Sequence, residues 1–252
     1  MMLEVKNVYI SYKKTGNRFK KEKLNVINGV SFSIRAGECV GLVGESGSGK
    51  STLSRLILGI EKADQGSILI EGKEVSNWIK ANKGQMSVVF QDYTSSANPR
   101  YKVSDVIGEL LHAFGKKEGI KDKVESLIEK VGLPLSIASR YPHELSGGQL
   151  QRVCIARAIS ANPKLLVLDE AISSLDVSTQ SQIMELIYNL KDSMNMTILF
   201  IAHDLQAVTH LCDRVMFLQN GQIIEQVASS NLSEVQNEYA QRLLHSVIQF
   251  NA

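Results

Sequence analysis

The segment 44–51, with the sequence GESGSGKS, constrains the fold more than any other part of the chain. It fits the pattern G-x-x-x-x-G-K-[ST], which requires a β-strand before it and an α-helix after it. The apolar segment 39–43 has the composition of a buried strand, and the segment 51–58 has a helical pattern. The sequence therefore predicts a strand, a phosphate-binding loop and a helix, in that order.

The residue types of this loop suit a phosphate group. Glycines let the backbone curl so that successive N–H groups point at phosphate oxygens, and a helix N-terminus adds partial positive charge. Lys50 supplies a full positive charge for the β and γ phosphates of a nucleotide, and the Ser51 hydroxyl can ligate Mg²⁺. The residues expected to bind the nucleotide are Gly44, Glu45, Ser46, Gly47, Ser48, Gly49, Lys50, Ser51 and Thr52.

Short aliphatic segments alternate with helical patterns along the chain, which is typical of a mainly parallel sheet covered by helices. The opening segment 3–34 alternates more, which favours antiparallel strands at an edge. The segment 93–141 is helical and poor in strands, as expected of a helical subdomain inserted into an α/β core. The clearest strands are expected at 39–43, 87–90, 165–168 and 197–201.

One of these strands ends in two carboxylates. The apolar residues 165–168 are followed directly by Asp169 and Glu170. Ligands of open α/β sheets bind at the carboxyl ends of the strands. We therefore expect Asp169 to hold Mg²⁺, and Glu170 to orient or deprotonate the attacking water.

Composition excludes several classes of protein. The chain has 252 residues and a formal net charge of +2, whereas a dedicated nucleic-acid binder would carry a strong basic excess. No apolar run approaches the ~20 residues needed to span a bilayer. No secretion signal opens the chain, so a cytosolic protein is predicted.

Two further groups of residues carry expectations of their own. The scattered Cys39, Cys154 and Cys212 are expected to be buried thiols. The basic stretch from Lys13 to Lys23 is expected to be a solvated loop or, alternatively, a contact for anionic lipid.

The segment 145–149, LSGGQ, resembles the signature motif of the ATP-binding cassette (ABC) ATPases. Ser146 also suits a helix N-cap, and both roles are compatible because a capped helix start with two glycines is an anion site. In this family the signature of one subunit faces the γ-phosphate bound by its partner. The resemblance implies a dimer with two ATP molecules at its interface, contacted by Leu145, Ser146, Gly147, Gly148 and Gln149.

The remaining motifs of the family follow in order. Tyr12 is similar to the aromatic that stacks on adenine, although Phe19 lies nearby and Tyr12 could instead be an ordinary surface or core aromatic. Gln91 resembles the glutamine that reaches Mg²⁺ and the attacking water, and His203 resembles the histidine that contacts the γ-phosphate. The loop that touches the partner's site across the dimer is expected at Ser174, Leu175 and Asp176.

The resemblance covers nearly the whole chain and implies a single ABC ATPase domain. The α/β nucleotide-binding core is expected at about 1–92 and 156–226, the helical subdomain at about 93–155, and a short C-terminal tail at 227–252. The implied cofactors are ATP and Mg²⁺. The implied partners are a second, different ABC ATPase, two membrane permease subunits and an extracellular binding protein, with this chain peripheral on the cytoplasmic face of the membrane and no nucleic acid bound.

The residues at the motif positions are similar to those of the peptide and nickel importer group. FQD at 90–92 followed by NPR at 98–100, and YPHE at 141–144, are typical of this group. LQRVC at 150–154, DEAIS at 169–173 and the short tail favour the branch that imports nickel, cobalt or zinc, free or bound to an opine-like chelator. The alternatives are a di- or oligopeptide importer, an exporter cassette, and a soluble ABC factor acting on ribosomes or DNA.

Overall fold

The computed structural model describes residues 1–13, 23–115, 118–173, 175–202 and 205–248. The segment 14–22 of the basic stretch, and the predicted site residues Ser174 and His203, lie outside the described residues. Contacts divide the chain into two compact units. Unit 1 comprises residues 1–81 and 199–252, and unit 2 comprises residues 82–198.

Unit 1 contains an antiparallel sheet in the order β2-β1-β4-β5, which confirms the antiparallel strands predicted for the opening segment. Its inward side chains, such as Leu3, Val5 and Val8, are buried. The helix α2 follows this sheet and anchors itself through Trp78, whose indole N–H donates to the Glu71 carboxylate at 2.9 Å. The bounds are β1 Leu3–Lys13, β2 Lys23–Ile34, β4 Gln65–Ile70, β5 Lys73–Glu74 and α2 Val75–Ala81.

The second part of unit 1 carries the predicted phosphate-binding loop, residues 44–51. The strand β3 (Cys39–Val43) is buried along its length, pairs in parallel with β9 (Arg214–Gln219), and leads through the loop into α1 (Lys50–Ile57). The strand–loop–helix order predicted from the sequence is therefore confirmed. The other elements are α8 (Leu205–Leu211), β10 (Gln222–Ala228), η3 (Ser229–Glu234) and α9 (Glu238–Ile248).

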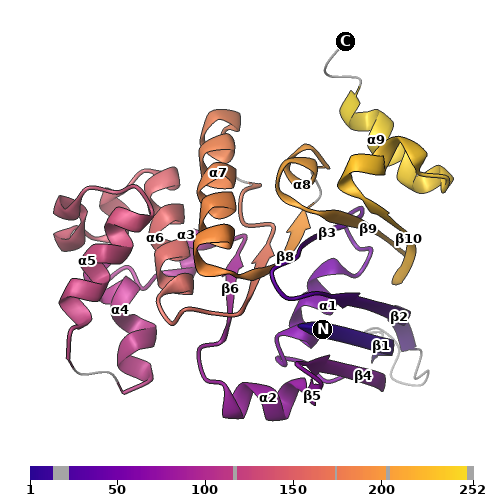
Figure 1. Cartoon of the computed structure of the whole chain (residues 1–252), viewed down its shortest axis with the longest axis horizontal. Coiled ribbons are helices and arrows are strands. Elements are labelled where there is room, and N and C mark those ends of the chain that lie inside the picture. Colours follow the sequence, from indigo (N-terminus) through magenta and orange to yellow (C-terminus); the bar gives the residue numbers. More distant parts are fainter. Residues whose placement is uncertain (14–22, 116–117, 174, 203–204, 249–252) are drawn as a thin grey trace. The chain divides into compact units, whose positions relative to one another are not determined.

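Unit 2 joins a parallel strand pair to a group of helices. The strands β6 (Met86–Phe90) and β7 (Leu165–Asp169) pair in parallel, and β8 (Thr197–Ala202) contains the boundary to unit 1. The helices α4, α5 and α6 pack against one another (Figure 1). The helical bounds are α3 Tyr93–Ser96, α4 Val103–Ala113, α5 Ile120–Lys130, η1 Leu135–Ser139, η2 Pro142–Glu144, α6 Gly147–Ile159 and α7 Val177–Met194.

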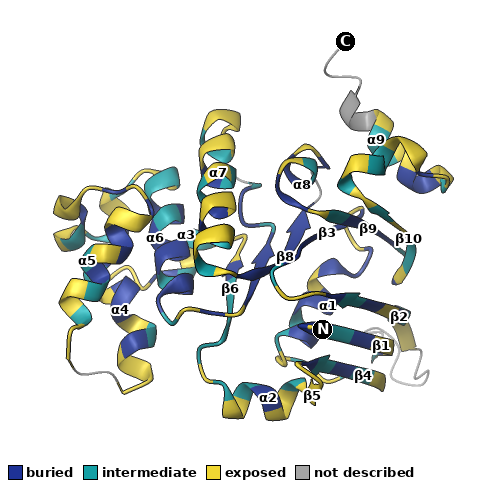
Figure 2. Cartoon of the chain, in the orientation of Figure 1, coloured by how far each residue is buried: buried dark blue, intermediate teal, exposed yellow. Residues whose placement is uncertain are grey.

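Burial follows these elements. Figure 2 shows β3 and β8 buried throughout, whereas α7 keeps an exposed face and buries Ile183, Ile187 and Leu190. The predicted burial of all three cysteines is confirmed. Within the described ranges, no helix combines the length and apolar character that crossing a membrane requires. The expected boundaries of the helical subdomain and of the C-terminal tail remain predictions.

Candidate active site

The predicted phosphate-binding loop contains two glycines in a backbone conformation that residues with side chains rarely adopt. Gly47 and Gly49 have φ angles of +80° and +111°, in the left-handed region. A Cβ on Gly49 would also lie 2.8 Å from the Ile27 side chain and 3.0 Å from the Val26 carbonyl oxygen. The strand β2 thus packs directly against the loop, and α1 begins at the next residue.

Lys50 is buried in this loop. Its Nζ donates to the carbonyl oxygens of Gly44, at 2.7 Å, and Glu45, at 3.0 Å. The Ser48 hydroxyl is also buried and has no hydrogen-bond partner among the described residues. A buried ammonium group beside a buried, unsatisfied hydroxyl and a helix N-terminus fits an anionic ligand such as a phosphate.

Tyr12 lies beside the first turn of α1. Its hydroxyl donates to the Glu61 carboxylate, which also accepts a hydrogen bond from Arg55 Nε at 2.7 Å. Burial and the neighbouring carboxylate raise the pKa of Tyr12, and its hydroxyl also interacts with Thr52. Tyr12 therefore stands next to the last residue of the predicted nucleotide loop, with its hydroxyl fixed.

In unit 2 the carboxyl ends of two strands bring three predicted residues together. Phe90 of β6 is in register with Asp169 of β7, so Gln91 and Glu170 both follow at the same edge. Gln91 Nε2 donates to Ser173 Oγ at 3.3 Å, and Ser173 Oγ donates to the Glu170 carbonyl oxygen at 2.9 Å. Ser173, which motif spacing did not single out, links the two predicted catalytic residues.

Glu170 has an unusual backbone. Its φ of 51° lies in the left-handed region, which is strained for a residue with a side chain. The turn after it is held by Gln151 Nε2, which donates to the Ala171 carbonyl oxygen at 2.6 Å. Such strain clusters at functional sites, where the surrounding structure maintains it. Asp169, one residue earlier, is buried with 9% of its surface exposed.

The signature segment starts α6 with a reciprocal cap. Ser146 Oγ accepts from the Gln149 N–H at 3.3 Å, and Gln149 Oε1 accepts from the Ser146 N–H at 3.1 Å. The segment lines a hollow of about 470 Å³ that it shares with Leu175 and Asp176 of the predicted dimer loop. The structure thus brings residues 146–149 of the signature segment together with Leu175 and Asp176 within unit 2.

A second helix start faces the same hollow. Asp176 caps α7, accepting from the Thr179 N–H at 3.0 Å and from the Thr179 hydroxyl at 2.7 Å. Hydrogen bonds from Ser178 and Thr179 hold the pKa of Asp176 well below its usual range, so its carboxylate stays ionised at neutral pH. Arg152 adds a positive charge to the lining. The lining therefore combines two helix N-termini and the Arg152 guanidinium with the Asp176 carboxylate, which offsets part of their positive charge.

Comparison with known proteins decides the family. The model of the family described as ABC transporter matches residues 27–173, which is more than half of the chain. The chain belongs to the ABC transporter family. The α/β P-loop fold and the ATP-hydrolysing activity predicted from the sequence are confirmed.

The relatives of this ABC protein include importer subunits. The metal-staphylopine import system ATP-binding protein CntF of Staphylococcus aureus is 42% identical over 251 residues, which cover 99% of this chain and 100% of that protein. The oligopeptide transport ATP-binding protein OppF of Haemophilus influenzae is 37% identical over 260 residues, covering 98% of this chain and 78% of that protein.

Solved ABC structures share the fold. The dimeric post-hydrolysis state of the ATP-binding cassette MJ0796, bound to ADP and Pi, has a TM-score of 0.79 and 26% identity, and the match covers 90% of this chain and 99% of that one. The structure of cbiO1 from Clostridium perfringens, part of the cbiONQ ABC transporter complex, has a TM-score of 0.79 and 27% identity, with 96% and 93% covered.

The ABC signature requires glycine for close packing. A Cβ on Gly148 would lie 2.7 Å from the Thr179 methyl group, whose rotamer is held by the hydroxyl bond to Asp176. Although alanine normally favours a helix, we expect Gly148→Ala to lower the free energy of unfolding by about 1–3 kcal/mol through overpacking. Thr179→Ser, which removes the methyl and keeps the hydroxyl, should restore most of the loss. Denaturant unfolding of the single and double variants tests this contact, and wild-type stability of Gly148→Ala would contradict it.

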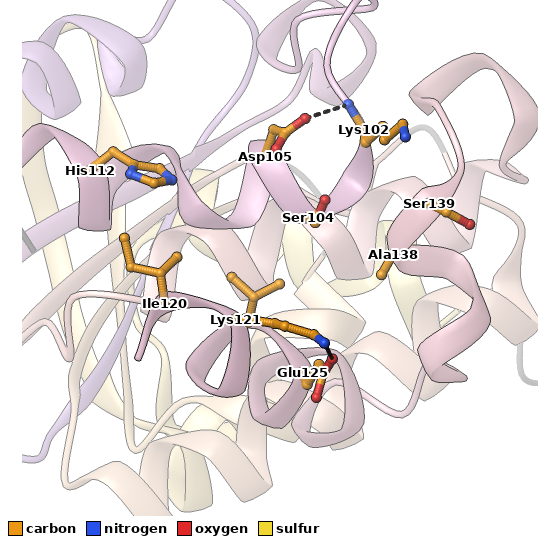
Figure 3. Close-up of a pocket in the computed structure, with 10 residues that line it drawn as sticks. Lys102, Ser104, Asp105, His112, Ile120, Lys121, Glu125, Ala138 and Ser139 are labelled. Carbon is orange, nitrogen blue, oxygen red and sulfur yellow. Dashed lines mark hydrogen bonds and ion pairs between the residues drawn. The ribbon is translucent and has the colours of Figure 1, made fainter. Parts of the chain in front are cut away.

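A separate hollow of about 420 Å³ contains none of the predicted site residues. It lies in unit 2 where α4, α5 and η1 meet (Figure 3). Its two carboxylates have local partners: Glu125 pairs with Lys121 at 3.9 Å, and Asp105 accepts from the Lys102 backbone N–H at 3.3 Å. The chemistry predicted from the ABC motifs therefore belongs to the loop, the strand ends and the signature, not to this hollow.

Proposed function

We propose that this chain is the nucleotide-binding subunit of an importer and that its ATP hydrolysis drives uptake of nickel, cobalt or zinc, free or as a metal–chelator complex. The observation that supports the proposal most strongly is the similarity to CntF, which is 42% identical over 99% of this chain and the whole of that protein. The sequences around Gln91 and before Leu145, which resemble those of the importer group, support the same conclusion.

A peptide importer is the second candidate. The similarity to OppF is the specific observation that favours it, since 98% of this chain matches at 37% identity. The transported ligand would be recognised by the extracellular binding protein and the permeases, not by this subunit. The two candidates therefore share one mechanism in this chain and differ only in the ligand transported.

The chain's own groups would bind ATP through the loop. Backbone N–H groups of the loop after Glu45 and the Lys50 ammonium would bind the phosphates, while the Tyr12 ring stacks on adenine. The Glu61 carboxylate, by holding the Tyr12 hydroxyl, keeps that ring beside Thr52. Ser51, Asp169 and Gln91 would hold Mg²⁺, which when bound neutralises charge on the phosphates.

Hydrolysis would use the carboxylate of Glu170, the residue with the strained backbone. Glu170 orients a water for in-line attack on the γ-phosphorus and accepts its proton, and the bond from that phosphorus to the leaving oxygen of ADP breaks. Gln91 contributes a side chain held through Ser173. The imidazole of His203 would contact the γ-phosphate.

The signature would act on the ATP of a second, different ABC subunit. Ser146, at the start of α6, faces the partner's γ-phosphate, while Ser174, Leu175 and Asp176 touch the partner's site. Because the γ-phosphate would join both halves, ATP favours the closed dimer and ADP does not. Opening and closing would be transmitted to two permease subunits on the cytoplasmic face of the membrane, through the segment that follows Gln91.

The proposal is tested in a source strain that carries either the wild-type chain or Glu170→Gln. Cellular nickel, cobalt and zinc and the uptake of a labelled oligopeptide are measured side by side. We expect the variant to lose metal accumulation and to retain peptide uptake. Loss of peptide uptake with unchanged metal content would instead establish the peptide importer.

A further inference from the structure

The C-terminal helix reaches the phosphate-binding loop through one tyrosine. Tyr239, in the first turn of α9 (yellow in Figure 1), is buried with 4% of its surface exposed. Its hydroxyl oxygen accepts a hydrogen bond from the Glu45 N–H at 2.8 Å, across 194 residues of sequence. A buried tyrosine hydroxyl generally needs a polar partner, and here that partner is the backbone of the loop.

Lys50 holds the same peptide unit from its other side. The carbonyl of Gly44 accepts from Lys50 Nζ at 2.7 Å, and the N–H of the same peptide, on Glu45, donates to Tyr239. A peptide unit is planar, so fixing both its N–H and its C=O fixes its rotation. Tyr239 and Lys50 therefore set the orientation of the first peptide of the loop together.

Hydrogen bonds hold the start of α9, and with it Tyr239, in place. Asn237 Oδ1 accepts from the Tyr239 N–H at 2.9 Å and caps the start of α9. The N–H groups of Gln236 and Asn237 each donate at 2.9 Å to the Glu225 carboxylate of β10. The chain from β10 through this cap to Tyr239 is a continuous set of hydrogen bonds that ends on the loop.

We propose that Tyr239 is a positioning residue for ATP binding, which makes the segment from Glu225 to α9 a functional part of the nucleotide site. This inference rests on the assignment of 44–51 as the phosphate-binding loop. The Lys50 ammonium has to exchange its bonds to the Gly44 and Glu45 carbonyls for bonds to phosphate oxygens. When Lys50 leaves, the Tyr239 hydroxyl keeps the Gly44–Glu45 peptide in place.

The hydroxyl is suited to this role across the physiological pH range. Burial raises the pKa of Tyr239, so the phenol stays protonated and neutral near the loop. A neutral acceptor fixes the Glu45 N–H without placing a negative charge where phosphates bind. Glutamate at this position would hold the same N–H and repel the nucleotide.

The test compares Tyr239→Phe with wild type in the full chain, using titration with a fluorescent ATP analogue and steady-state hydrolysis in the assembled transporter. Loss of one neutral hydrogen bond should raise the Kd and KM for ATP about fivefold, with kcat changed by less than about twofold. Asn237→Ala should act in the same direction. Combined with Tyr239→Phe it should add little, because both act through one contact.

Controls separate this inference from its premise. Tyr188→Phe makes the same change at an exposed tyrosine of α7 and should leave ATP affinity unchanged. If Lys50→Ala does not weaken binding, the loop assignment fails and the inference fails with it. If Lys50→Ala weakens binding but Tyr239→Phe does not, the inference alone is overturned. A fall in kcat and melting temperature without a change in KM would also overturn it, since that pattern indicates a purely structural role.

Discussion

Glu170→Gln is expected to reduce ATP turnover by about 100- to 10,000-fold while leaving ATP binding intact. Glutamine has nearly the shape of glutamate but cannot accept a proton, and a positioned general base contributes a factor of this size. The left-handed backbone at Glu170 and its link through Ser173 to Gln91 remain available to the variant. Since the γ-phosphate is then retained, the closed ATP-bound dimer should accumulate with the proper partner subunit.

Two quantities are measured for the variant: the kcat of ATP hydrolysis, and the molar mass of the protein in solution with ATP, which shows whether the dimer accumulates. Glu185→Gln is the matched control, because Glu185 lies on the same unit in an exposed position of α7. The control should turn over ATP at the wild-type rate and should not accumulate a closed dimer. Normal turnover by Glu170→Gln would remove Glu170 from its proposed role.

Lys50→Ala is expected to weaken ATP binding by about 100-fold. Lys50 is 5% exposed and lies within the loop, and hydrogen bonds to charged groups contribute about 1.5–3 kcal/mol each. The variant also loses the donor to the Gly44 and Glu45 carbonyls, so the loop loses part of its own support. The loss of the positive charge and the loss of support for the loop both weaken binding of the phosphates of ATP.

Equilibrium titration with ATP and with adenosine distinguishes this effect from unfolding. The affinity for ATP should fall far more than that for adenosine, which carries no phosphate. Lys80→Ala, at an exposed position in the last turn of α2, is the matched control and should bind ATP like wild type. An unchanged ATP affinity in Lys50→Ala would contradict the assignment of the phosphate-binding loop.

Local patterns were sufficient to predict much of the fold. The strand at 39–43 and the loop after it were predictable because a buried apolar strand, a glycine-rich turn and a helix start are encoded within a dozen consecutive residues. The N-cap at Ser146 was likewise predictable, since it depends on residues within one helical turn, whereas the reciprocal bond from Gln149 was not predicted. The structure confirms the strand, the helix start and the N-cap expected at these segments, and the roles of the motif residues remain predictions.

Contacts between distant segments could not be predicted in the same way. Nothing near Glu61 shows that its carboxylate fixes Tyr12, 49 residues away, or that Tyr239 supports Glu45. The only available signal at Tyr239 was the helical spacing of apolar residues after Glu238, which indicates a packed helix but not its partner. The need for glycine at 148 likewise depends on Thr179, which comes from a different helix.

The most direct test of the account is uptake of a labelled metal–chelator complex into vesicles that contain the complete transporter, with ATP sealed inside and the binding protein outside. The account predicts accumulation that requires ATP and disappears when this chain carries Glu170→Gln. ATP hydrolysis by the same vesicles with no accumulation of the labelled complex would contradict it.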